Sequence, residues 1–471
     1  MQPQLIGFCV LGAYCFWASI LGASFARLHL SVSFLNFPIF IGEGVMLFCL
    51  AISGWFLYKG HFPWTSRLRL FFAYLGYVVL WAGFDYFKAG GSSLALRNAE
   101  MFFYPVFAFF SYSFYCPALF SRRTIQLFFV VLLMALCLIG TAPFFSFLFF
   151  LLFFAVFFAM FHGPWKYFWG TAILVLWPYS TFFSGARTWL VSSVLTGLLL
   201  IFLFIKYFIK VNKIWRVGAG LAAAAIFLWT AFHFADRNGL KTLSTPVRVV
   251  GDYRRVENLI QQKSSSFHSE QLQVQPYNIY VTQPKPNNSQ EVLKPRLLKK
   301  DLKKDLTEKY AANKEVSSRN LQTAYNDIIF RILIWQDMMQ ELWDNKSIFG
   351  VGLSHPQRSR SIEILGWASS EWRSVGWITP HNSFLDLIYR AGILGLGIIY
   401  VIFAVLSGLI MDFIAARSVP GILLSGTIIY GLIAANFLLI LELPYYAIPF
   451  WSLFGLTLAY RRNLLPRAKT R

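Results

Sequence analysis

The chain repeatedly runs through stretches of about 20 mostly apolar residues, the length that crosses a bilayer as a helix. Clear examples are Leu5–Ser24, Trp189–Ile209 and Ile393–Met411. Only 13% of the residues are charged, well below the share usual for soluble domains. Backbone groups inside lipid must be hydrogen-bonded within the chain. We therefore predict an all-α polytopic membrane protein with about 12 transmembrane helices and one large, partly helical loop.

The predicted spans are the segments in which apolar residues dominate. They are residues 5–24, 37–58, 68–84, 101–119, 125–141, 144–161, 166–182, 188–209, 214–234, 391–412, 421–441 and 446–460. The first segment lacks the basic start of a signal peptide and is followed by equivalent segments, so we interpret it as the first span.

Basic residues flank these spans unequally, and such residues concentrate on the cytoplasmic side of membrane proteins. The short outer connections contribute only Arg27, Lys88, Arg97 and Arg187. The other connections and the C-terminal tail contribute Lys59, Arg67, Arg69, Arg122, Arg123, Lys166, Lys206, Lys210, Lys213, Arg216, Arg417, Arg461, Arg462, Arg467, Lys469 and Arg471. This asymmetry predicts cytoplasmic N- and C-termini and places the loop at 235–380 outside.

The net charge of +21 follows this pattern, so it indicates membrane topology and does not predict a nucleic-acid partner. The five cysteines all fall in apolar stretches, which suggests neither a disulfide framework nor a zinc site. Within the outer loop, the polar segment 261–304 has little apolar periodicity, and the sequence does not decide whether it is ordered. Residues 326–343 predict an amphipathic helix that lies on the membrane or packs against the bundle.

Three polar residues stand at the predicted outer face, where such residues are few. Arg187, between two apolar spans, is either an interfacial arginine or a cation for a phosphate group. Arg331 either pairs with Asp327 at helical spacing or points into a pocket between loop and membrane. His381, where the loop re-enters the membrane, is either structural or a base for an attacking hydroxyl.

The segments around these residues resemble the bacterial O-antigen ligase and polymerase superfamily, polytopic membrane glycosyltransferases that use undecaprenyl-diphosphate-linked glycans. The similar motifs are Ser184-Gly185-Ala186-Arg187, Arg331-Ile332-Leu333-Ile334-Trp335, Gly350-Val351-Gly352-Leu353-Ser354-His355 and His381-Asn382-Ser383-Phe384-Leu385 followed by Gly392. The separation of Arg187 from Arg331 is longer than the family pattern, and Trp335 stands where ligases often have leucine.

The resemblance implies a GT-C-like enzyme of the bacterial inner membrane that acts in the periplasm. It would transfer a glycan from undecaprenyl diphosphate to an acceptor hydroxyl, with inversion and without metal or cofactor. Arg187 and Arg331 would bind the diphosphate, and His381 would act as the general base. Arg97 and Tyr104 are weaker candidates for donor contacts. The implied partners are the lipid-linked donor, lipid A core or a growing glycan as acceptor, and membrane lipids.

Several alternatives stay open. Within the superfamily, a polymerase or a protein-directed oligosaccharyltransferase differs from a ligase only in the acceptor. A transporter of lipid-linked glycans is disfavoured because few ionisable residues lie within the spans. Asp85 and Glu100 are weak candidates for a cation site. The predicted units are an N-terminal bundle at 1–178, a catalytic region at 179–397 and C-terminal helices at 398–471.

Overall fold

The structure is a computed structural model that describes residues 3–26, 28–31, 38–59, 66–91, 93–115, 187–207, 318–365 and 380–469, with a few isolated positions between 218 and 261. The predicted spans at 125–141, 144–161 and 166–182 lie outside the described residues, as do nearly all of the span at 214–234 and of the polar segment 261–304.

The N-terminal part is a group of helices with one small hairpin. Its elements are α1 (Pro3–Leu21), α2 (Ala23–Ala26), β1 (His29–Ser31), β2 (Pro38–Phe40), α3 (Ile41–Tyr58), α4 (Ser66–Lys88), α5 (Ser93–Phe103) and α6 (Val106–Phe114). The two strands pair antiparallel, with Leu30 opposite Ile39.

The later part supplies α10, two helices within the predicted outer loop and the helices that follow the loop. They are α10 (Arg187–Tyr207), α14 (Ser318–Asp344), α15 (Arg360–Ile364), α17 (Ser383–Ala391), α18 (Ile393–Ala415), α19 (Val419–Ala435) and α20 (Pro444–Lys469). Helix α20 packs closely on α6, and a side chain at Gly455 would overlap the Ala108 backbone.

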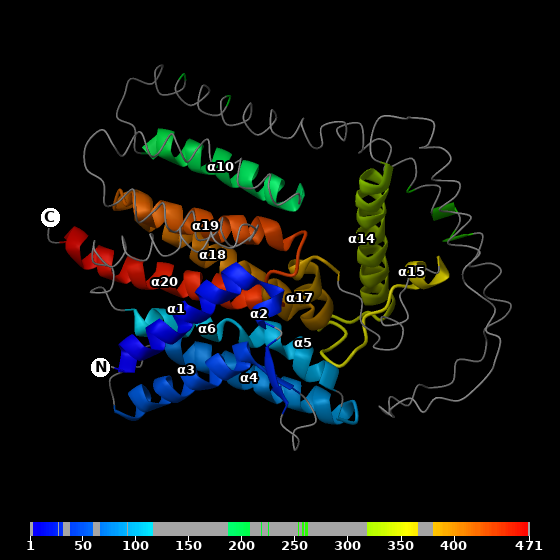
Figure 1. Cartoon of the computed structure of the whole chain (residues 1–471), viewed down its shortest axis with the longest axis horizontal. Coiled ribbons are helices and arrows are strands. Elements are labelled where there is room, and N and C mark those ends of the chain that lie inside the picture. Colours follow the sequence, from blue (N-terminus) through cyan, green and yellow to red (C-terminus); the bar gives the residue numbers. More distant parts are fainter. Residues whose placement is uncertain are drawn as a thin grey trace.

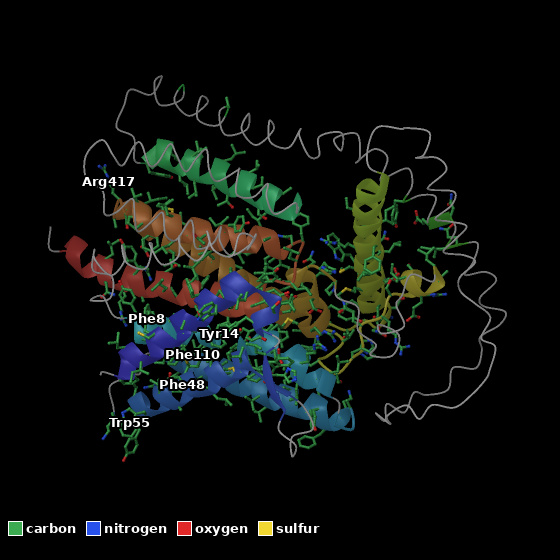
Figure 2. The ribbon with its side chains drawn as sticks, in the orientation of Figure 1. Phe8, Tyr14, Phe48, Trp55, Phe110 and Arg417 are labelled. Atoms are coloured by element: carbon green, nitrogen blue, oxygen red, sulfur yellow. The ribbon has the colours of Figure 1, made fainter. Side chains whose placement is uncertain are left out.

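The long apolar helices run in similar directions, whereas α14 stands across one end of the bundle (Figure 1). Arg417, in the turn between α18 and α19, lies at the opposite end (Figure 2). Lys59, also predicted to be cytoplasmic, lies 5.0 Å from the centre of the Trp55 ring, and Trp55 is likewise drawn far from α14 (Figure 2). Arg417 and Lys59, both predicted to be cytoplasmic, thus lie away from the loop helix (Figure 2).

Within the described residues, two helical stretches are long and apolar enough to cross a membrane, Arg69–Lys88 and Ile393–Ala415. Shorter apolar helices occupy Leu5–Ala18, Ile41–Phe56, Val194–Leu203 and Val419–Ala435. All six fall on predicted spans. The helical character of the fold is therefore confirmed, while the described helices do not amount to the full predicted set of spans.

Two details of the all-α prediction are wrong. Residues 38–40, assigned to the second span, form strand β2, and the helix starts only at Ile41 because the Glu43 carboxylate accepts the Phe40 N–H at 2.9 Å. The predicted span at 101–119 is divided into α5 and α6 at Tyr104–Pro105. Proline has no N–H to donate to the preceding turn and is well suited to the start of a helix, so the division falls there.

Gly392 joins α17 to α18 with φ of +55°, a conformation that favours glycine. A Cβ there would overlap the Ile348 carbonyl oxygen and lie 2.5 Å from the Gly350 nitrogen. We expect Gly392→Ala to destabilise the protein by at least about 1–3 kcal/mol from backbone strain alone. The measurement is thermal unfolding in detergent. Gly397→Ala is the matched control, since nothing lies within 4 Å of its Cβ position, and equal melting temperatures would contradict the prediction.

Candidate functional site

One face of α14 connects two distant parts of the chain. The Arg331 Nη1 donates to the Phe437 carbonyl oxygen at 2.8 Å, in the loop between α19 and α20. The Trp335 Nε1 donates to the Pro380 carbonyl oxygen at 2.6 Å, directly before His381. Residues four apart on a helix share a face. Arg331 and the segment that carries His381 are therefore held on the same side of α14.

His381 stands in a left-handed conformation, with φ of +51°. Non-glycine residues seldom adopt this conformation, and those that do are concentrated at functional sites. The next residue, Asn382, caps α17 by accepting the Leu385 N–H at 3.0 Å. The His381 side chain is half-buried. The local structure thus fixes the backbone of His381 at the start of α17 and leaves part of the residue accessible.

The loop between α19 and α20, residues 436–443, also holds α17. The buried Ser383 hydroxyl accepts the Leu441 N–H at 3.1 Å and donates to the Glu442 carboxylate. Burial raises the pKa of the Glu442 carboxyl well above its usual range, and the charge of Asp386 raises it further. Because Phe437 binds Arg331 in the same loop, this loop positions both candidate residues.

Sequence analysis does not single out Glu442, and it includes Ser383 only as a residue of the His381 motif. Glu442 lies in the short connection between the predicted spans 421–441 and 446–460. The signal that could have identified it is its position, since an acidic residue at the edge of two spans is costly to keep there without a role.

The Gly350–His355 turn is fixed from several sides. Arg390 is fully buried, pairs with Asp386 at 3.4 Å and donates to the His355 carbonyl oxygen at 2.6 Å. From the N-terminal bundle, Asp85 accepts the Leu353 N–H at 2.6 Å. Asp85, considered for a cation site with Glu100, is thus bonded to this turn. Among the described residues, no group of three or more His, Cys, Asp or Glu side chains is arranged to hold a metal ion.

His355 and α14 are joined through Glu341. The His355 Nε2 lies 2.7 Å from one Glu341 carboxylate oxygen, and the Tyr389 hydroxyl donates to the other at 2.5 Å. Burial works to raise the pKa of Glu341, but these two hydrogen bonds and the charges of His355 and Arg390 outweigh it and lower the pKa. The ionised carboxylate therefore holds α14 to both the Gly350–His355 turn and α17.

The other predicted site residues are less closely connected. Arg187 is the first residue of α10, and its side chain lies outside the described residues, as does that of Asp327. Tyr104 is buried, and its hydroxyl donates to Glu100 at 2.8 Å. Arg97 is exposed on α5. The structure thus connects Arg331 with the His381 segment, while the remaining assignments stay predictions.

The lowered pKa of Glu341 gives a prediction of pH dependence. A carboxyl whose pKa falls on folding stabilises the protein above its unfolded pKa, about 4.3 for Glu, and this stabilisation is lost as the pH falls through the lower folded pKa. We expect Glu341→Gln to lower the melting temperature at pH 7 and to lose less on acidification than wild type. Glu363→Gln, at an exposed position on α15, is the control and should follow wild type. Parallel pH profiles for wild type and Glu341→Gln would contradict this role.

Comparison with known proteins gives one match. A family model described as O-antigen ligase matches residues 170–400, which contain Arg187, Arg331 and His381. No curated protein and no solved structure matches the chain. The resemblance predicted from the motifs is therefore confirmed over residues 170–400, and this match supports the O-antigen ligase and polymerase superfamily.

Proposed function

We propose that this protein is an O-antigen ligase, which transfers a glycan from undecaprenyl diphosphate to lipid A core in the periplasm. The family match supports a membrane-embedded enzyme of ligase or polymerase type. The observation that carries the site assignment is the loop at 436–443, which binds Arg331 through Phe437 and the His381 helix through Ser383. A cation and a base held by one loop suit a reaction with an anionic leaving group and a hydroxyl nucleophile.

In this proposal, Arg331 stabilises the diphosphate as it leaves. Negative charge grows on the leaving group as the glycosidic bond breaks, and a preoriented donor stabilises that charge without reorganising. The hydrogen bond to the Phe437 carbonyl fixes the direction of the guanidinium, so part of its ordering is complete before the donor binds. Arginine also suits phosphate because its planar fork can make two parallel hydrogen bonds.

Arg187 joins this site if α10 runs antiparallel to α19, as the predicted topology requires. The two helices pack together, with the Leu200 side chain over Gly426. Arg187 precedes Leu200 by between three and four helical turns, and Phe437 follows Gly426 by about three turns. Antiparallel packing then puts Arg187 level with the loop that binds Arg331. Two guanidinium groups at that level would share the diphosphate.

His381 is the proposed general base. Its imidazole takes the proton from the acceptor hydroxyl while that oxygen bonds to the anomeric carbon and the carbon–diphosphate bond breaks, which inverts the anomeric centre. The arginines supply the positive charge that this mechanism needs, so we propose that it requires no metal ion. Arg97 and Tyr104 are the proposed further contacts with the lipid-linked glycan donor. The polyprenyl chain would lie among the apolar helices.

A polymerase is the second candidate, because the matched family supports ligase and polymerase chemistry alike. The two enzymes would use the same donor and the same charged residues. They differ in the acceptor, which is lipid A core for a ligase and another lipid-linked glycan for a polymerase.

The test is transfer by purified protein in lipid nanodiscs, supplied with undecaprenyl-diphosphate oligosaccharide and lipid A core. We expect His381→Gln and Arg331→Lys each to reduce kcat by about 10²-fold or more, because one loses the base and the other the planar fork. The control is Arg358→Lys, which changes an exposed arginine of the predicted outer loop at 235–380. This variant should keep wild-type activity.

Core-linked product from wild type supports the ligase, and elongated lipid-linked glycan supports the polymerase. Full activity of both site variants would overturn the residue assignment. Wild type that makes neither product, although correctly folded, would count against both proposed acceptors.

A further inference from the structure

The C-terminal end of α14 and the turn that follows it expose large apolar side chains. Trp343 is 80% exposed, and Ile348 and Phe349 are each 67% exposed. We call residues 343–349 the interfacial turn. Contiguous apolar groups outside a hydrophobic core usually mark a surface that meets a partner or a membrane.

The interfacial turn is attached to the beginning of a membrane-spanning helix. The Ile348 carbonyl oxygen accepts the N–H of Ile393, the first residue of α18, at 2.9 Å. Helix α18 is one of the two described helices that are long and apolar enough to cross a membrane. Its Ile393 and Leu396 are exposed, as expected of side chains that face lipid. The turn therefore continues the apolar surface of α18 at the end where the loop enters it.

The apolar stripe of α14 itself is used in a different way. Ile329, Leu333, Ile334 and Met338 are buried together with Ile362, Leu365 and Tyr389. The sequence leaves open whether this helix lies on the membrane or packs against the bundle. In the structure, the apolar stripe of α14 packs against protein, on α15 and α17. Since α14 stands across the end of the bundle (Figure 1), its long axis lies along the membrane plane when the bundle spans the bilayer. Membrane contact is left to the turn at its C-terminal end.

We propose that the interfacial turn inserts into the outer leaflet of the inner membrane and fixes the depth of α14. Its composition fits the membrane–water boundary, where tryptophan is enriched and lysine reaches headgroup phosphates. The exposed Lys346 lies between Trp343 and Ile348, and the acidic Asp344 lies two residues before it. Arg331 lies about 18 Å along the same helix from Trp343, so the depth of the turn sets the level of Arg331 relative to the headgroups.

A lipid surface explains the turn better than a second copy of the chain. Trp343 and Phe349 offer at most roughly 500 Å², at 150–250 Å² for each aromatic, and Ile348 adds one aliphatic side chain. A stable protein interface needs roughly 800 Å² from each partner. The surface continues onto exposed residues of α18, a helix long and apolar enough to cross the membrane, and the bilayer covers such a helix along its length.

The test measures depth and does not depend on enzymatic activity, so it stands apart from the proposed function. A nitroxide is attached at Phe349→Cys in a chain whose five native cysteines are replaced, and the protein is placed in nanodiscs. Power saturation compares collisions with oxygen, which partitions into lipid, and with a water-soluble nickel chelate. The matched control is a label at Arg358→Cys, an exposed position nine residues further along the predicted outer loop.

We expect the label at 349 to favour oxygen over nickel by several-fold, and the label at 358 to show the reverse. Nickel access at 349 equal to that at 358 would overturn the proposal. Dipolar broadening that disappears on dilution with unlabelled protein would also overturn it, in favour of a second copy. If the cysteine-free chain fails to fold, a ketone-bearing amino acid at 349 carries the same label with the cysteines intact.

Discussion

The hydrogen bonds that the α19–α20 loop makes with Arg331 and Ser383 are the contacts on which the candidate site depends. They join α14, α17 and the last two helices, which are widely separated in sequence. The loop lies beyond residue 400, where the family match ends. The residues that resemble the family therefore need a segment outside the match to hold them in place, and a mutation in that segment would disturb the site without touching a motif.

Beneath His381, the structure maintains a costly arrangement of charge. Arg390 is fully buried beside Asp386, and the charge of Asp386 acts on Glu442. Burial raises the pKa of Asp386 and, more strongly, that of Glu442. Burying charged groups rarely stabilises a protein more than apolar packing would. Their value here is positional, because Arg390 binds the Gly350–His355 turn while Glu442 accepts from Ser383.

The predictable parts of the molecule are those that depend on local pattern. Apolar length predicts α18 and the helices of the N-terminal bundle, and the motifs single out Arg331 and His381, whose roles stay predictions. Helix α14 was expected from its periodicity, but its packing partner was not, because amphipathicity does not distinguish protein from lipid. The β1–β2 hairpin depends on pairing between two separate short segments, and the Ser383–Glu442 contact depends on tertiary register. Neither is encoded in the pattern of a single segment.

The ties between α14 and the rest of the site have a consequence for how such proteins diversify. Arg331 and Trp335 are fastened to residues 437 and 380, so the geometry of these groups does not depend on how many residues separate α10 from α14. The connection can lengthen at a modest entropic cost, since closing a loop twice as long costs about 0.6 kcal/mol more. The long polar segment in this chain can thus be gained, lost or exchanged as a unit, which leaves the chemistry in place while the surface offered to acceptors changes.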